Sequence, residues 1–201
     1  MNDILMLQAT RLGKKYNSQW VFRGIEFCLE KGECLLVTGP NGSGKSTLLR
    51  LLAGLESPTE GSIEKNIRDA RKDIGFASPE LRLYANLTGL EHLQLTARLR
   101  GCDVNSGNTH VLLNDVGLSL DCKKPTSAYS TGMRARLRLA MAIQTKPKIL
   151  LLDEPSVSLD ENGREILKNI IANQRNRGCI ILATNDPYDR QFGEWEINLG
   201  K

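Results

Sequence analysis

The sequence predicts one α/β domain over residues 1–201, with a mainly parallel sheet, a small N-terminal antiparallel β layer and a helical subdomain nested at about residues 80–143. Several apolar runs are only four or five residues long, which suits strands buried on both faces of a parallel sheet. Segments with helical periodicity separate these runs, and this alternation is typical of a sheet covered by helices on both faces. A length of 201 residues is ample for one compact core.

The N-terminal third is predicted to hold the antiparallel layer and the first buried strand. Strands are expected at 4–11 and 21–29, and the second alternates apolar with polar residues, as a half-buried strand does. Cys34–Thr38 is an apolar run that fits a fully buried strand. From Lys45 the leucines recur at helical spacing, and Gly54 is placed to end that helix.

The rest of the chain continues the alternation. Short strands are expected near Ile63 and at Ile74–Ala77. Thr88 and Glu91 have the spacing of a capping box, so a helix should begin there. A polar loop is expected at 101–108. Further helices are predicted at 110–116, 132–145 and 162–176, and further strands at 149–152, 180–184 and 195–199.

Composition and charge exclude several classes of protein. With 40% apolar and 25% charged residues, the chain has the balance of a soluble globular protein. Its apolar runs are far shorter than the roughly 20 residues of a membrane helix, and the N-terminus does not read as a secretory signal. The 27 basic and 23 acidic residues give a net charge of +4 without a basic cluster, so no nucleic acid is expected as a partner. We expect a cytoplasmic protein.

The cysteines and histidines do not indicate a metal site or a redox site. The five cysteines and two histidines are scattered without metal-ligand spacing, so neither structural zinc nor a disulfide framework is expected. His92 lies on the helix predicted to begin near Thr88. Because no cysteine or carboxylate pair accompanies it, we expect a half-buried or surface histidine rather than a catalytic one.

A glycine-rich loop follows the first buried strand and is the predicted phosphate site. Its residues are Gly39, Pro40, Asn41, Gly42, Ser43, Gly44, Lys45, Ser46 and Thr47. They satisfy G-x-x-x-x-G-K-[ST] between a strand and a helix, the context that gives this motif its meaning. The glycines let backbone N–H groups close around a phosphate at the positive helix end. Lys45 would neutralise the terminal phosphates, and Ser46 would offer its hydroxyl to Mg²⁺. The loop predicts a P-loop NTPase that binds ATP with Mg²⁺.

Two adjacent acids, Asp153 and Glu154, follow the apolar residues 149–152 at the carboxyl end of a predicted strand. Hydrolysis of a bound triphosphate needs a second anchor for the metal and a group that orients the attacking water. We expect Asp153 to hold Mg²⁺ through water and Glu154 to polarise the attacking water. An acidic pair on the surface is the alternative, which the four preceding apolar residues disfavour.

These motifs together resemble the ATP-binding-cassette (ABC) ATPases, and the resemblance covers nearly the whole chain. Tyr16 resembles the aromatic residue that stacks on adenine, although ordinary packing would also explain it. The segment YSTGMRARLRLAMA, 129–142, is similar to the ABC signature. This similarity implies that Ser130 and Gly132 reach the γ-phosphate bound by another subunit.

Two later segments complete the resemblance. SVSLD, 156–160, resembles the loop by which two subunits communicate, with Asp160 as the matching acid. ILATND, from Ile181, resembles the family's switch segment. The resemblance also assigns three arginines to the polar, outward face of the signature helix, so nucleic-acid binding through them is kept only as a remote alternative. They are Arg134, Arg136 and Arg138.

Four positions depart from the family pattern. In the signature, Thr131 replaces a glycine and Met133 replaces the usual glutamine. The other two departures bear on hydrolysis. Pro79 stands where the family has the glutamine of its glutamine loop, so Glu80 or Ser78 would have to contact the metal or the water instead. The switch has Asn185 where family members usually have histidine, and asparagine can donate a hydrogen bond but cannot relay a proton. Losing one preorganised donor can cost about 10²-fold in rate. Slow hydrolysis is therefore expected unless Asn185 suffices.

The resemblance implies an ATPase subunit of an ABC transporter. Two copies would close on ATP and open after hydrolysis by Glu154, with Lys45 and Asn185 assisting. This cycle would drive export through a separate integral membrane permease subunit, which would hold the chain on the inner face of the cell membrane. The short length resembles the haem exporter ATPase of cytochrome c maturation, whereas the wording YSTGMRARL resembles drug, lipid or polysaccharide exporters.

Two alternatives remain open at the level of sequence. One is a soluble ABC protein that works on ribosomes, DNA or iron–sulfur assembly, although the tandem cassettes, coiled-coil inserts or basic arm that would favour it are not seen. The other is a nucleotide-gated clamp that binds ATP and barely turns it over, which Pro79 and Asn185 motivate.

Overall fold

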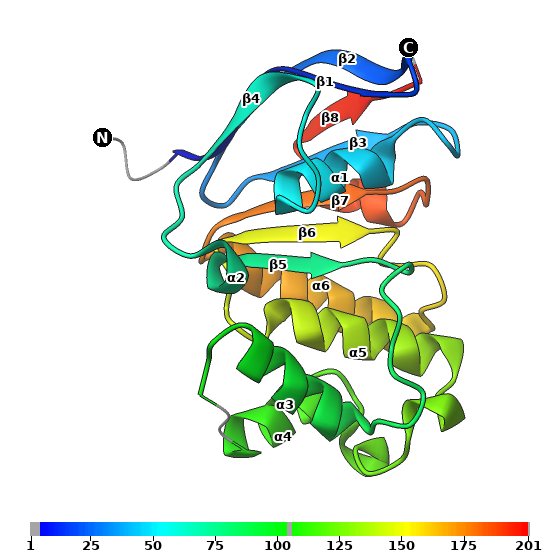
Figure 1. Ribbon diagram of the computed structural model, residues 1–201. Helices are drawn as coiled ribbons and strands as arrows, with labels where there is room; N and C mark the ends of the chain where they lie inside the picture. Colours follow the sequence, from blue (N-terminus) through cyan, green and yellow to red (C-terminus); the bar gives the residue numbers. More distant parts are fainter. Residues whose placement is uncertain (1–4, 104–105, 201) are drawn as a thin grey trace.

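The computed structural model describes residues 5–103 and 106–200, which form two sheets with helices around them (Figure 1). The larger sheet is parallel throughout and has the strand order β5-β6-β7-β3-β8. Its strands are β3 (Cys34–Thr38), β5 (Ile74–Ala77), β6 (Ile149–Asp153), β7 (Cys179–Ala183) and β8 (Trp195–Asn198). All residues of β3, β6 and β7 are buried, which explains why these strands read as unbroken apolar runs. The predicted mainly parallel α/β sheet is confirmed.

The smaller sheet is antiparallel and has the order β2-β1-β4. Its strands are β1 (Leu5–Tyr16), β2 (Gln19–Glu30) and β4 (Glu60–Lys65). β1 and β2 run further than the ranges expected from hydrophobic alternation. Their pairing continues to a two-residue turn in which Asn17 and Ser18 have φ angles of 46° and 70°. Backbone pairing next to such a turn sustains a ladder where the side-chain pattern has already stopped.

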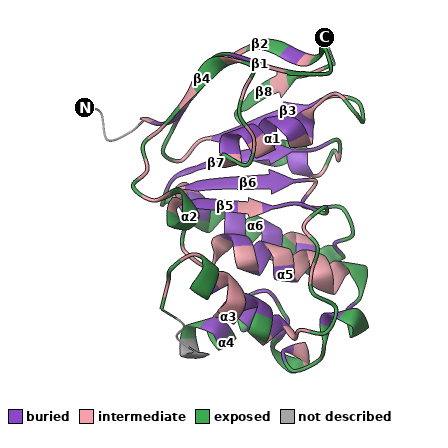
Figure 2. Cartoon of the chain, viewed as in Figure 1, coloured by how far each residue is buried: buried purple, intermediate pink, exposed green. Residues whose placement is uncertain are grey.

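Both faces of the parallel sheet are covered, one by a helix together with the smaller sheet and the other by helices alone. α1 (Lys45–Ala53) packs with the antiparallel layer in one buried cluster, and α5 (Thr131–Ile143) and α6 (Glu161–Arg175) pack on the other face. Figure 2 shows the central strands between these layers as continuously buried. Within the described ranges, no helix combines the length and apolar character needed to cross a membrane.

A mostly helical segment between β5 and β6 lies below the parallel sheet in Figure 1. It contains α3 (Gly89–Leu99), α4 (Ser106–Asp115), the short helices η1 (Ser119–Asp121) and η2 (Thr126–Ala128), and α5. Thr88 and Glu91 form the predicted capping box at the start of α3. The loop expected at 101–108 is wrong at its end, because α4 begins at Ser106, and residues 104–105 lie outside the described residues. The bounds of 80–143 for a subdomain stay a prediction.

Four short helices were not predicted, because each is too short to show a periodicity. They are α2 (Ala70–Asp73), η1, η2 and η3 (Asp189–Phe192). The exposure expected for His92 was also wrong, since its side chain is 2% exposed. Its Nε2 accepts a hydrogen bond from the Tyr84 N–H at 2.9 Å, and its Nδ1 lies 2.9 Å from the carbonyl oxygen of Thr88. The ring therefore ties the loop before α3 to the first turn of that helix.

Two of the three α5 arginines do not point freely into solvent, although this was expected for the outward face of this helix. Arg136 donates hydrogen bonds to the carbonyl oxygens of Val116 and Gly117, and Arg138 donates one to that of Leu81. Both side chains are half-buried. Because a guanidinium has five donors, it can satisfy carbonyls that end a helix or a loop. These arginines join α5 to the rest of the helical segment.

Candidate active site

The loop between β3 and α1 has the backbone that a phosphate site needs. Gly39, Gly42 and Gly44 have φ angles of 138°, 84° and 102°, a region that side chains disfavour. A Cβ on Gly44 would lie 2.4 Å from the side chain of Val21. Gly44 is also the N-cap of α1, and no described side chain caps that helix. The positive end of α1 is therefore open toward the loop.

This loop borders a hollow of about 410 Å³. Its lining residues are Val21, Asn41, Gly42, Gly44, Lys45, Ser46, Thr47, Arg50, Glu80 and Glu154. Within the loop, a Cβ on Gly39 would lie 2.8 Å from Ser43 Oγ, and that hydroxyl is buried without a hydrogen-bond partner in the described part of the chain. Backbone donors and a lysine around one hollow, with the unpartnered Ser43 hydroxyl in the same loop, form a cradle suited to a polyanion.

Lys45 and Glu154 face each other across this hollow. Lys45 is 6% exposed, and its Nζ donates a hydrogen bond of 2.8 Å to the carbonyl oxygen of Gly39. The same Nζ lies 3.8 Å from Glu154 Oε1. The backbone N–H of Glu154 donates to the carbonyl oxygen of Ala183 at 2.8 Å, and its φ angle is 46°. A carboxylate held rigidly at this place can orient and deprotonate a water near a bound phosphate.

Asn185, the residue in the predicted switch, reaches both the loop and the acid. Its Nδ2 donates a hydrogen bond of 3.1 Å to Asn41 Oδ1. Its backbone N–H donates one of 3.3 Å to Glu154 Oε2. The structure therefore brings together Lys45, Glu154 and Asn185, the residues that the sequence marked as catalytic.

Asp153 is buried beside the loop, with 4% of its surface exposed. Its Oδ2 accepts a hydrogen bond of 3.1 Å from Ser78 Oγ. Burial raises the pKa of the Asp153 carboxyl, against hydrogen bonds from Ser46 and Ser78 that lower it. Its Oδ1 is buried and lacks a partner among the described residues. An unpartnered carboxylate oxygen close to a serine hydroxyl fits the oxygen ligands that Mg²⁺ prefers.

Glu80 lines the hollow, but its carboxylate is held by another residue. Arg50 Nη1 donates a hydrogen bond of 3.0 Å to Glu80 Oε2, and Arg50 Nη2 donates one of 3.2 Å to Thr47 Oγ1. It is Ser78, and not Glu80, that contacts Asp153. Of the two substitutes proposed for the missing glutamine, this conformation brings Ser78 to the acid and pairs Glu80 with α1. Glu80 as a metal ligand stays a prediction.

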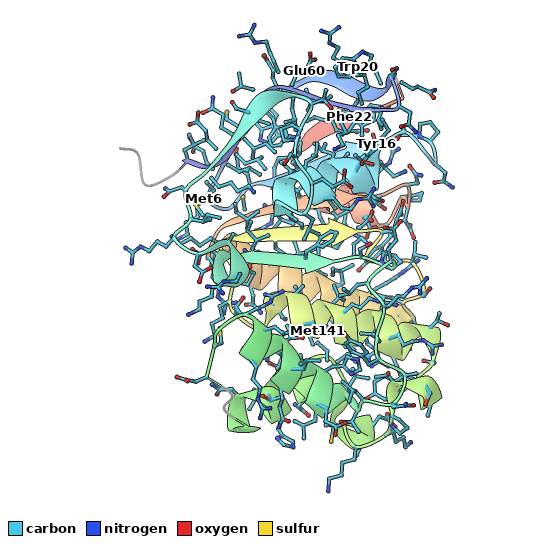
Figure 3. All side chains as sticks on the ribbon, viewed as in Figure 1. Met6, Tyr16, Trp20, Phe22, Glu60 and Met141 are labelled. Atoms are coloured by element: carbon cyan, nitrogen blue, oxygen red, sulfur yellow. The ribbon has the colours of Figure 1, made fainter. Side chains whose placement is uncertain are left out.

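Tyr16 lies at the end of β1, on the side where the β5 and β6 arrows end (Figures 1 and 3). The ring is 42% exposed, and Lys14 Nζ lies 4.8 Å from its centroid. Its hydroxyl donates a hydrogen bond to Glu56, whose pKa is lowered by this bond and by bonds from Arg50 and Lys14. The ring is thus fixed in orientation but is not among the residues that line the hollow.

The signature residues make contacts unrelated to their own phosphate loop. Ser130 is the N-cap of α5, and its Oγ accepts a hydrogen bond of 3.1 Å from the Met133 N–H. A Cβ on Gly132 would lie 3.0 Å from the carbonyl oxygen of Ser158, so the signature packs against the SVSLD loop. Asp160 caps α6 by accepting from the Gly163 N–H at 2.8 Å. Ser130 begins a helix on the face of the sheet opposite α1.

Three residues near the site were missed from the sequence: Ser156, Thr184 and Asp189. Asp189 Oδ2 accepts hydrogen bonds from Thr184 Oγ1 at 2.7 Å and from Ser156 Oγ at 2.9 Å. Ser156 and Thr184 belong to recognised segments, but nothing in the sequence singled out their hydroxyls. Asp189 lies in an unremarkable polar stretch, so only the folded chain reveals that these groups meet.

Comparison with known proteins agrees with this geometry. A family model described as ABC transporter matches residues 22–157. The lantibiotic transport ATP-binding protein SrtF of Streptococcus pyogenes is 36% identical over 185 residues, covering 90% of this chain and 80% of that protein. The cytochrome c biogenesis ATP-binding export protein CcmA of Nitrosomonas europaea is 33% identical over 191 residues, covering 91% and 89%. The ATP-binding cassette MJ0796, solved as a dimer in a post-hydrolysis state bound to ADP and Pi, superimposes with a TM-score of 0.85 at 25% identity, covering 97% of this chain and 94% of that one.

Proposed function

The chain belongs to the ABC transporter family as an ATPase subunit, and from that premise we propose that two copies enclose Mg·ATP and hydrolyse it to power export through a separate membrane subunit. The observation that carries the proposal is the position of Glu154 at the end of a buried strand, 3.8 Å from Lys45 and bonded to the backbone of Asn185.

In this proposal each residue has a distinct task. The backbone of the glycine-rich loop and Lys45 bind the phosphates. Ser46 and Asp153 hold Mg²⁺, which when bound offsets the negative charge of the triphosphate. Glu154 takes the proton of the attacking water, and the Asn185 amide donates to a γ-phosphate oxygen. Tyr16 offers its ring to the adenine.

Two copies are needed because the signature of one copy does not reach the phosphate loop of the same copy. Ser130 and Gly132 begin α5 on the face of the sheet opposite α1, so a second copy must present them to the loop. A solved relative is described as a dimer in a post-hydrolysis state with ADP and Pi, which supports the same arrangement here. We propose a homodimer.

Export is supported by the functions for which relatives are named, which include lantibiotic transport and cytochrome c biogenesis export. Haem is one candidate cargo, because the relative named for cytochrome c biogenesis has nearly the length of this chain. The cargo would be selected by the membrane subunit, which would also hold the chain at the inner face of the cell membrane. Coexpression with a candidate permease and recovery of both in the membrane fraction tests this part. Recovery of the chain only in the soluble fraction would count against it.

The enzymatic part is tested with Glu154→Gln and Lys45→Ala. Glu154→Gln should lower kcat by about 10² to 10⁴-fold, as removal of a general base does, while Mg·ATP still binds. Lys45→Ala should weaken ATP binding itself by about 10 to 100-fold. Steady-state phosphate release and equilibrium binding of ATP measure the two effects. Equal turnover by wild type and Glu154→Gln would refute the assigned base.

A slow, nucleotide-gated clamp is the second candidate, because Asn185 replaces the usual histidine and Glu80 is paired with Arg50. In that case ATP closes the pair tightly and turnover is rare. The two candidates are distinguished by comparing the rate at which the ATP-bound dimer opens with the rate at which it hydrolyses ATP. A closed dimer that opens mostly with its ATP unhydrolysed supports the clamp, and a dimer that opens once per hydrolysis event supports the transport ATPase.

A further inference from the structure

Behind Glu154 lies a buried cluster that the proposed mechanism does not yet use. Its members are Ser156, Thr184 and Asp189, with exposures of 1%, 0% and 0%. Ser156 follows β6 and begins the SVSLD loop, Thr184 follows β7 directly before Asn185, and Asp189 begins η3. Three separate segments around the active site therefore meet at one carboxyl group.

Hydroxyl groups surround one oxygen of this carboxyl, while the other oxygen has no described partner. Oδ2 of Asp189 accepts from Thr184 Oγ1 at 2.7 Å and from Ser156 Oγ at 2.9 Å. Oδ1 is buried without a hydrogen bond to any of residues 5–103 and 106–200. Burial raises the pKa of the Asp189 carboxyl, the two hydroxyl bonds lower it, and the charges of Asp186 and Glu154 raise it. Burying an acid under these conditions costs stability.

The cluster touches the catalytic carboxylate through Thr184. Thr184 Oγ1 lies 3.4 Å from Glu154 Oε2 and 2.7 Å from Asp189 Oδ2. A hydroxyl has one proton to donate, so the shorter contact to Asp189 takes it. Thr184 Oγ1 in turn accepts the Asp186 N–H at 2.9 Å, which fixes the turn after Asn185. Asp189 thus orients the Thr184 hydroxyl, which lies against Glu154, the proposed base.

We propose that Asp189 is a positioning residue for hydrolysis. By accepting from Thr184 and Ser156, it fastens the switch at Asn185 and the start of the SVSLD loop to the strand end that carries Glu154. These are the elements expected to face the second copy, so closure of the pair is transmitted to the base as one rigid movement. Because Asn185 cannot relay a proton, the rate depends on the orientation of Glu154 and Asn185. This inference rests on the proposed ATPase mechanism.

Three substitutions test the inference in the full-length chain with Mg·ATP. Asp189→Ala removes the acceptor, Thr184→Val removes one hydroxyl at nearly constant shape, and Asp189→Asn keeps an acceptor oxygen. Asp189→Ala and Thr184→Val should lower kcat by about 10 to 100-fold, the effect of misplacing a reacting group by a fraction of an ångström to one ångström. The KM for ATP should change by less than about twofold, because the phosphate loop is untouched. Asp189→Asn should stay within about threefold of wild type.

Gln174→Leu is the matched control. Gln174 is also a buried polar residue, 2% exposed, but its Nε2 donates to the carbonyl oxygen of Pro147, which precedes the amino end of β6. It should lower the melting temperature and leave kcat per folded molecule unchanged. Should Asp189→Ala fail to fold, Thr184→Val decides the matter.

Wild-type kcat in Thr184→Val, or a loss no larger than that of Gln174→Leu at equal stability, would overturn the inference. The inference would also be overturned if Asp189→Asn were as inactive as Asp189→Ala. Loss of the acceptor oxygen would then not explain the loss of kcat. In each of these results the wild type remains an ATPase. A wild type without turnover would instead remove the proposed function, and the inference with it.

Discussion

The phosphate-loop side and the signature side of the molecule differ in how complete they are within one copy. On the phosphate-loop side, Lys45, Glu154, Asn41 and Asn185 contact one another around a hollow of about 410 Å³. On the signature side, Ser130 bonds only the start of its own helix among the contacts described. One side is an assembled binding site, and the other presents donors at a helix start without a ligand from its own chain.

From this difference we expect nucleotide binding and hydrolysis to depend on different regions. Nucleotide affinity should follow from the loop of a single copy, whereas turnover should require a second copy to supply Ser130 and Gly132.

Mixing two inactive variants should restore hydrolysis. Lys45→Ala and Ser130→Arg should each lower turnover by about 10²-fold or more. A mixed pair contains one intact site, built from the loop of one copy and the signature of the other. An equal mixture should therefore recover about a quarter of the wild-type rate if copies pair at random. Phosphate release measures this, and a mixture no faster than its components would show that the site lies within one copy.

Nucleotide binding by a dilute, unpaired copy should distinguish the same two residues. Lys45→Ala should weaken ATP binding by about 10 to 100-fold, the cost of losing charge-assisted hydrogen bonds. Ser130→Arg should bind as wild type does. Titration with a fluorescent ATP analogue at submicromolar protein measures both. Weakened binding in Ser130→Arg would place the signature nearer its own loop than the fold indicates.

Asn185→His should raise kcat by up to about tenfold, since a histidine adds a titratable donor next to Glu154. The exposed position and the contacts to Asn41 and Glu154 leave room for this change. KM should stay within about twofold. The pH profile is the sharper readout, because a new dependence between about pH 6 and 7 is expected from the imidazole. A lower kcat would mean that Asn185 is already the best residue for this switch.

Stability should respond to pH through Asp189, which is the smallest effect. Burial raises the pKa of this carboxyl above its ordinary 3.8. Between 3.8 and the raised pKa the folded state holds the proton that the unfolded state has lost, so stability falls as pH rises through that window and is full below it. Asp189→Asn removes this dependence. The melting temperature of Asp189→Asn relative to wild type should increase from pH 4 to pH 8. Parallel curves for the two proteins would contradict the pKa direction.

Local patterns predicted much of the fold. β3 and β5 lie at their expected residues, and Thr88 and Glu91 form the expected capping box, because each depends on neighbours in the sequence. The ends of β1 and β2 were missed, since pairing with another strand extended them beyond the apolar alternation. The phosphate loop was predictable for the same reason as β3, as its glycines and lysine act within nine residues.

Contacts between distant residues could not be predicted from one sequence. Ser78 meets Asp153 across 75 positions, and Arg50 meets Glu80 across 30. Residue type alone allowed either Ser78 or Glu80 to substitute for the missing glutamine. Choosing between them requires the path of the chain after β5. Asp189 is a similar case, because a polar residue after the switch gains its meaning only when Thr184 and Ser156 fold against it.

The left-handed backbone at Glu154 has a consequence for the stability of this protein. A residue with a side chain pays about 1 kcal/mol or more for a φ angle of 46°, whereas glycine would adopt it freely. Replacing Glu154 with glycine should therefore relieve backbone strain while removing the acid that we propose as the base of hydrolysis. A glutamate in this conformation is thus a place where stability and the proposed activity favour different residues.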